Sequence, residues 1–191
     1  MVKLFIEEVA PLYACCDVLL TAQDIASASR FQNERRRAEH LAWRRVVRRE
    51  LGRDVVIDYD EVGAPIVDTP NIYISVSHAR GCVAVAIADC RVGVDVELID
   101  RDFDRVQSRY MSDSEASLSS ASWWSAAVWS AKEAMFKYYG VRGIELLSDL
   151  RIERYDAERG VAVGCLVGEH SVEVEISHPA ENLVVALAHA K

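Results

Sequence analysis

The segment VGVDVE, residues 92–97, carries two acidic side chains on one face of a predicted strand. Valines alternate with Gly93, Asp95 and Glu97, and this period of two is typical of a strand with two different faces. Two negative charges at neighbouring positions of one face repel each other unless a cation or water relieves them. An edge strand that faces water often carries acids as well, so this pair alone does not indicate a metal site. A metal site would need a further ligand from another segment.

The segment WSAKEAMFKYYG, residues 129–140, offers that ligand. On a helix, Trp129, Glu133 and Lys137 follow one another at intervals of four and share one side. Taken alone, such a Glu–Lys pair is a routine exposed ion pair. If the helix meets the strand, three carboxylates form an oxygen site suited to Mg²⁺, and the lysine can neutralise charge on a transferring phosphoryl group.

Residues 30–53 form a basic block, with nine arginines against three glutamates, in a chain of net charge −8. Arg37, Arg44 and Arg48 follow a spacing of seven and then four, which places them on one stripe of a helix predicted over 34–51. Guanidinium groups match phosphate oxygens, although a solvated helix face has the same pattern. A local basic block on an acidic chain favours a small polyanionic ligand and argues against nucleic acid.

The hydrophobic pattern predicts an α+β fold. The segments Val76–Ala88 and Ile176–Ala188 align without a gap as two strand–turn–strand units. We interpret them as a duplication that gives two halves related by a pseudo-twofold axis, residues 1–98 and 99–191, although a chance match of short apolar strands is the alternative. Each half would pack a long helix on an antiparallel sheet, and the active site would lie in the cleft between the halves.

Turn, cap and periodicity signals place the individual elements. SDSEASL offers a capping box between Ser112 and Glu115, and Gly52 and Gly140 are expected to end the two long helices. The expected strands are 3–9, 73–76, 83–88 and 93–98, followed by antiparallel strands from about 150 onward; the expected helices are 21–29, 34–51 and 122–139.

Composition limits the classes of protein to which the chain can belong. Its 191 residues are 51% hydrophobic and 27% charged, no apolar run approaches the length of a membrane span, and the N-terminus lacks the pattern of a signal peptide. We therefore expect a cytoplasmic protein without a membrane partner. The five cysteines are an odd number without CxxC spacing, so we expect free thiols: Cys15, Cys16, Cys82, Cys90 and Cys165.

Taken in order, these motifs resemble those of the 4′-phosphopantetheinyl transferases. VGVDVELID is similar to the aliphatic-Gly-aliphatic-Asp-x-Glu strand of that family, and WSAKEAMFKYYG to its Trp/Phe-Ser-x-Lys-Glu-Ala-x-x-Lys helix. Upstream, ISVSH resembles the strand of the family that ends in Ser-His, and RFQNERRRAEHLAWRRVVRREL resembles its arginine-rich helix. RYMSDSE resembles the stretch between the two signature motifs. The length and the internal repeat are similar to the monomeric type typified by the activators of surfactin synthetase.

The resemblance implies a reaction and a metal. Such an enzyme moves the phosphopantetheine arm of coenzyme A to a serine of an apo carrier protein and releases adenosine 3′,5′-bisphosphate. Asp95, Glu97 and Glu133 would hold Mg²⁺, and Lys137 would bind the pyrophosphate and stabilise the leaving group. Glu133 is also the candidate acceptor of the serine proton, and the motif leaves open whether it is ligand, base or both.

The resemblance also implies where coenzyme A binds. Ser77 and His78 are expected at its 3′-phosphate, Arg37, Arg44 and Arg48 near the nucleotide phosphates, and Lys132 as a further phosphate contact. The chain departs from the family at Ala64, where a lysine associated with the nucleotide is common, and the interval between the two signature motifs is short. The sequence does not determine whether the carrier belongs to fatty-acid, polyketide or peptide synthesis.

Two other functions fit some of the same residues. Another Mg²⁺-dependent phosphoryl or nucleotidyl transferase would use the three carboxylates without a carrier. A non-catalytic module that docks on proteins would use the arginine stripe as its interaction face, and would show no dependence on Mg²⁺.

Overall fold

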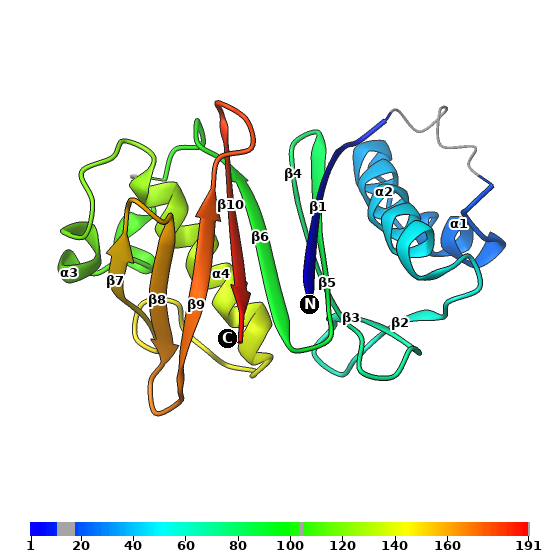
Figure 1. Cartoon of the computed structure of the whole chain (residues 1–191). Helices are drawn as coiled ribbons and strands as arrows, with labels where there is room; N and C mark the ends of the chain where they lie inside the picture. Colours follow the sequence, from blue (N-terminus) through cyan, green and yellow to red (C-terminus); the bar gives the residue numbers. More distant parts are fainter. Residues whose placement is uncertain (11–17, 104, 191) are drawn as a thin grey trace.

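The computed structural model describes residues 1–10, 18–103 and 105–190. Two main sheets stand side by side in it, and a short two-stranded sheet lies near the first (Figure 1). The first sheet has the order β1-β5-β4, and the second has the order β6-β10-β9-β8-β7. The elements are β1 (Val2–Glu8), α1 (Ala22–Ala28), α2 (Glu34–Leu51), β2 (Ile57–Tyr59), β3 (Pro65–Val67), β4 (Tyr73–Ala79), β5 (Cys82–Ala88), β6 (Val92–Leu98), a 3₁₀ helix (Gln107–Arg109), α3 (Asp113–Ala116), α4 (Trp124–Tyr139), β7 (Leu150–Asp156), β8 (Val161–Leu166), β9 (Ser171–Ser177) and β10 (Leu183–His189).

Helix α2 covers one face of the first sheet. It begins after Asn33, whose side chain accepts a hydrogen bond from the Arg36 backbone N–H, and it ends at Gly52 as predicted. Its apolar residues, among them Trp43 and Val46, form one core with residues of β4 and β5. The β2–β3 hairpin was not predicted, because the pattern there indicated only a connector rich in turns.

Helix α4 covers the second sheet and ends at Gly140, which adopts the left-handed conformation with φ 63°. The predicted capping box is confirmed: Ser112 and Glu115 cap each other at the start of α3, although that helix is only four residues long. Glu115 also accepts a hydrogen bond from the Ile152 backbone N–H, so the cap fastens α3 to β7.

Gly93 brings α4 and β6 unusually close together. A Cβ at this position would lie 1.9 Å from the carbonyl oxygen of Ala134, so no other residue fits without moving the helix. Because side chains alternate along a strand, Asp95 and Glu97 lie on the same face as Gly93. The glycine of the VGVDVE motif therefore brings the acidic face of β6 against α4.

The two sheets meet along a seam where β6 contacts β4 and β5, and the opposite face of β6 is buried there. Val92, Val94 and Val96 pack there with small residues of β5 and with β10. Strand β6 is therefore covered on both sides, and its alternation reflects two buried environments rather than one buried face and one solvated face. The expected boundary after residue 98 assigned β6 to the N-terminal half, whereas β6 pairs with β10 and belongs to the second sheet.

The architecture is mixed α+β with antiparallel sheets, as expected. The two repeated segments both form antiparallel hairpins, β4–β5 and β9–β10, but the sheets that contain them have three and five strands. The duplication stays a prediction. Among the described residues, no helix combines the length and the apolar character that crossing a bilayer requires. Cys82, Cys90 and Cys165 are free thiols, while Cys15 and Cys16 lie outside the described residues.

Candidate active site

Three carboxylates from β6 and α4 form one electrostatic cluster. The pKa of Glu133 is raised by burial first, and then by the negative charge of Asp95 and, more weakly, of Glu97. The pKa of Glu97 is likewise raised by burial and by Asp95. Such mutual effects place the three residues that the sequence predicted as metal ligands in one acidic region, between β6 and α4.

Asp95 occupies the centre of this cluster and is only 6% exposed. Its Oδ1 accepts hydrogen bonds from the Ser77 hydroxyl at 2.7 Å and from Lys137 Nζ at 2.9 Å. Lys137 also donates to the carbonyl oxygen of Val94 at 2.8 Å. Asp95 Oδ2, in contrast, is buried and has no hydrogen-bond partner among the described residues.

Glu97 has hydrogen-bond donors of its own, which differ from those of Asp95. Its Oε1 accepts hydrogen bonds from Arg101 at 2.6 Å and from the indole N–H of Trp129 at 3.1 Å. The Arg101 guanidinium lies over the rings of Phe103 and Trp129, at 5.3 and 5.4 Å from their centres. These cation–π contacts hold the charge of Arg101 close to the cluster.

These residues fit a hard divalent cation. In the described part of the chain, no three acidic, histidine or cysteine side chains already stand in coordinating positions, since Lys137 and Arg101 pair with two of the carboxylates. However, the unpartnered Oδ2 of Asp95 is a buried ionisable oxygen, and such atoms require compensation. Burial and the charge of Asp95 raise the pKa values of Glu97 and Glu133, and a cation bound beside them would favour their charged forms. Carboxylate oxygens are the ligands that Mg²⁺ prefers.

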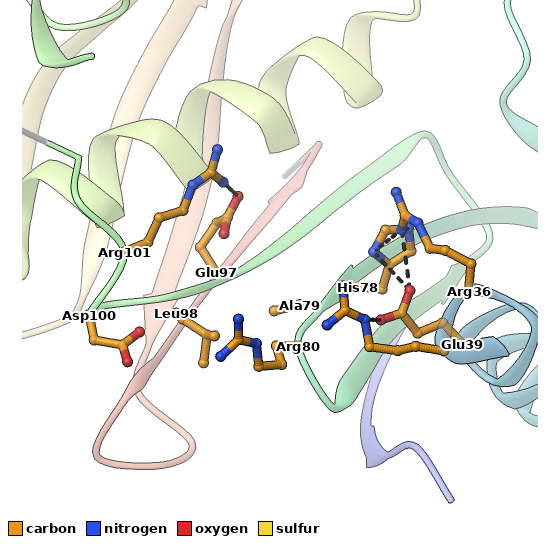
Figure 2. A pocket seen from close by; sticks show the side chains of 10 residues that line it. Arg36, Glu39, His78, Ala79, Arg80, Glu97, Leu98, Asp100 and Arg101 are labelled. Atoms are coloured by element: carbon orange, nitrogen blue, oxygen red, sulfur yellow. Dashed lines mark hydrogen bonds and ion pairs between the residues drawn. The ribbon is translucent and has the colours of Figure 1, made fainter. Parts of the chain in front are cut away.

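A groove of about 550 Å³ runs along the seam beside the cluster, and we call it the seam groove (Figure 2). In Figure 2, Arg36, Glu39 and His78 lie on one side of it and Glu97 and Arg101 on the other. Its lining residues are Arg35, Arg36, Glu39, His78, Ala79, Arg80, Glu97, Leu98, Asp100 and Arg101.

His78 lies at the α2 side of the seam groove, and its role as a phosphate contact stays a prediction. Burial first and the charge of Arg36 second lower its pKa, so its imidazole is neutral at pH 7. Arg36 contacts this imidazole and also pairs with Glu39 at 3.3 Å. The groove thus presents one neutral ring and several guanidinium groups to a ligand.

One further hollow adjoins the seam groove, and a second adjoins that hollow through shared residues such as Gly63 and Val76. The first, of about 270 Å³, shares Arg36 and His78 with the groove and adds the aromatic residues Phe31, Trp43 and Tyr59. The other, of about 370 Å³, is mainly apolar and reaches Lys137. Ala64 lines this last hollow, so the position where the family commonly has a lysine faces a hollow beside the cluster.

Arg44 and Arg48 do not face the groove, which corrects the expectation that they bind nucleotide phosphates. Each is 2% exposed, and they pair with Asp24 of α1 at 2.9 and 2.6 Å. Burial raises the pKa of Asp24, but hydrogen bonds from Arg48, Thr21 and Arg44 outweigh it and hold that pKa far below its usual range. Arg44 and Arg48 do share one side of α2, but that side faces α1 instead of the groove.

Arg37 lies outside the residues that line the groove. Its guanidinium donates to the carbonyl oxygens of Phe31 and Gln32, and it therefore fastens the segment before α2. Because successive helical residues are rotated by about 100°, its neighbours Arg35 and Arg36 point elsewhere and line the groove. Sequence spacing selected the wrong arginines of this run.

Lys132 and Ser77 also differ from expectation. Lys132 is fully buried, pairs with Glu115 at 2.8 Å and donates to the carbonyl oxygen of Leu146, so it cannot contact a phosphate. Ser77 is 8% exposed, and its hydroxyl points to Asp95 across the seam rather than into the groove. Only His78 of the Ser-His pair lines the groove.

The sequence analysis did not identify Arg36, Glu39, Arg80 and Arg101, which line the groove. One pair had a usable signal, because Glu39 follows Arg36 by three positions on a helix. Arg101 follows the end of β6 and lies outside any helix, so its spacing from Glu97 gave no such signal. Arg80 is in a turn, where no periodicity predicts its direction.

A buried acidic cluster borders a groove rich in guanidinium groups, and this arrangement suits a ligand that carries phosphate. The sequence model of the 4′-phosphopantetheinyl transferase superfamily matches residues 91–188, just over half of the chain, and the chain therefore belongs to this superfamily. The match contains Asp95, Glu97, Glu133 and Lys137, whereas α2 and the Ser-His strand lie outside it. No curated protein matches the chain at a significant level.

Proposed function

We propose that the protein transfers the 4′-phosphopantetheine moiety of coenzyme A to a serine hydroxyl of an apo carrier protein. Membership of the superfamily supports phosphopantetheine transfer in general. The observation that carries the proposal is the cluster itself: an unpartnered carboxylate oxygen of Asp95 beside two further acids, with Lys137 in contact.

The nucleotide part of coenzyme A would lie along the seam. Arg35, Arg36 and His78 at the seam groove offer donors for phosphate oxygens, and the adjoining aromatic hollow offers surfaces on which a base can stack. Both sides of the groove come from one chain, which favours an enzyme that works as a monomer, like the type that activates surfactin synthetase.

Asp95, Glu97 and Glu133 would hold Mg²⁺, which when bound offsets the charge that develops on the phosphoryl oxygens. Lys137 can then exchange its bond with Asp95 for one with the pyrophosphate, and stabilise the departing adenosine 3′,5′-bisphosphate. The serine oxygen forms a new bond to the phosphorus of the pantetheine arm as the bond to the nucleotide phosphate breaks. The proton of the serine passes to Glu133, directly or through a water molecule.

One experiment tests this function directly. The protein is incubated with coenzyme A, Mg²⁺ and a panel of apo carriers from fatty-acid, polyketide and peptide synthesis, and the carriers are weighed by mass spectrometry. We expect one phosphopantetheine to be added to the acceptor serine of at least one carrier, with no addition after chelation of the metal. The Lys137→Ala variant should retain its fold and react at least about a hundred times more slowly. If no carrier gains mass, the proposal is wrong.

A further inference from the structure

The two main sheets meet at β4 and β6 without sharing a backbone ladder, because these strands belong to different sheets. Two buried serines of β4 cross this seam. Ser75 Oγ accepts the backbone N–H of Val94 at 2.9 Å, and Ser77 Oγ donates to Asp95 Oδ1 at 2.7 Å. They lie two positions apart on one face of the strand, but one contacts backbone and the other contacts the centre of the acidic cluster.

The two donors to Asp95 Oδ1 differ in what else they can reach. The side chain of Lys137 is 26% exposed and borders a hollow, so its amine can move to an arriving phosphate. Ser77 is only 8% exposed, and Asp95 accepts the hydrogen bond from its hydroxyl. When Lys137 leaves, Ser77 continues to hold Oδ1, and Oδ2 continues to be the oxygen without a protein partner.

We propose that Ser77 is a positioning residue: it fixes the Asp95 carboxylate so that Oδ2 is presented to the divalent cation. The inference deepens the proposed function and rests on it. It also gives a role to the N-terminal part of the chain, since the acids and Lys137 come from β6 and α4, whereas Ser77 comes from the other sheet. Contact between the two sheets thereby determines the orientation of a metal ligand.

Ser75 provides a matched control, because its replacement removes a hydroxyl of the same strand, face and burial without touching the acids. The Ser75→Ala variant leaves the Val94 N–H unpaired and should lower thermal stability, but not the affinity for metal. Ser77→Ala should lower the affinity for metal and leave thermal stability nearly unchanged. Ser77→Cys serves as a second variant, since a thiol fills the space but donates only weakly. Ser77→Thr retains a hydroxyl and should restore binding.

The probe is Mn²⁺, whose free concentration is measured by electron paramagnetic resonance in the presence of protein and adenosine 3′,5′-bisphosphate. We expect Ser77→Ala and Ser77→Cys to bind Mn²⁺ at least tenfold more weakly than the wild type, and Ser75→Ala to bind within twofold of it. In the transfer assay, the Mg²⁺ concentration for half-maximal rate should rise for the Ser77 variants while the KM for coenzyme A stays constant.

The outcomes separate this inference from the function on which it rests. If the wild type binds Mn²⁺ and the two Ser77 variants bind it equally well, the positioning role is wrong while the transferase proposal stands. A rise confined to the KM for coenzyme A would also overturn it, because Ser77 would then contact the substrate. If the wild type itself binds no Mn²⁺, the metal assignment fails, and the role of Ser77 fails with it.

Discussion

Asp24 and Asp95 are both buried carboxylates that accept hydrogen bonds from cationic side chains, but they differ in what they leave unpaired. Asp24 binds two guanidinium groups and the backbone and hydroxyl of Thr21, and both of its oxygens have partners. Asp95 has two donors on one oxygen and none on the other among the described residues.

The charges that surround Asp24 and Asp95 also differ. Positive charge exceeds negative charge around Asp24, so its pKa is held low despite burial. Around Asp95, burial first and the negative charge of Asp95 second raise the pKa values of Glu97 and Glu133. A buried carboxylate whose two oxygens both have partners leaves no oxygen for a cation, whereas one with an unpartnered oxygen can accept a ligand. The Asp24 network is itself incomplete only on its cationic side, because Arg44 Nε has no partner among the described residues.

The largest effect on activity should come from the unsatisfied carboxylate. Replacement of Asp95 by Asn keeps the shape of the side chain but removes the charge that a metal requires, so the transfer rate should fall by about a hundred- to a thousandfold. Thermal unfolding should change little, because the loss of an ion pair is offset by relief of repulsion with Glu133. Transfer at the wild-type rate in the presence of Mg²⁺ would contradict the role of Asp95 as a ligand.

Replacement of Asp24, whose two carboxylate oxygens both have partners, should reduce stability and leave activity nearly unchanged. Asp24→Asn leaves two buried guanidinium groups without their counter-charge, and removal of one partner of a buried ion pair typically costs about 3–5 kcal/mol. Denaturant unfolding measures this loss. The rate per folded molecule should stay close to that of the wild type, and a specific loss of transfer in correctly folded protein would show that this network also serves the site.

A smaller contrast separates adjacent arginines of α2. Arg36→Ala removes a guanidinium that lines the seam groove and should raise the KM for coenzyme A about tenfold. Arg37→Ala removes a side chain that contacts only backbone carbonyls before the helix, and should change that KM by less than about twofold. Steady-state kinetics with both variants tests the orientation of the helix, and equal effects would contradict it.

The smallest expected effect is a dependence of stability on pH. In metal-free protein the pKa of Glu133 lies above 4.5, so the folded state binds more protons than the unfolded state between 4.5 and that raised value. The stability of the wild type relative to Glu133→Gln should therefore be greatest below pH 4.5 and decrease as the pH rises through the folded-state pKa. Thermal unfolding with a chelator measures it, since about 1 kcal/mol corresponds to roughly 2–4 °C in a chain of this size.

Addition of Mg²⁺ at the upper end of this pH range should restore the thermal midpoint of the wild type more than that of the variant, because the cation compensates the charge. A difference between the two proteins that is constant from pH 4.5 to pH 8 would show that Glu133 lies in no acidic cluster.

Much of the site was predictable because its signals are local. The period of two in VGVDVE placed Asp95 and Glu97 on one face, and the interval of four placed Glu133 and Lys137 on one side of a helix. The ends of the long helices followed from Gly52 and Gly140. Periodicity did not determine which arginines of α2 line the groove, because the arginines of this run lie on more than one side of the helix. Arg35 and Arg36 line the groove, whereas Arg44 and Arg48 pair with Asp24.

The sequence by itself determined most of the strands and helices and which of their residues share a face. That Gly93 must be free of a side chain, because a Cβ there would meet Ala134 of α4, emerged only from the structure. Only the tertiary structure decided which face meets which partner. Arg48 faces Asp24 and Lys132 faces Glu115, both distant along the chain, and Ser77 faces Asp95 across two sheets. Backbone geometry sets a period within a few residues, but the partner of a buried charge depends on packing between elements that no local pattern encodes.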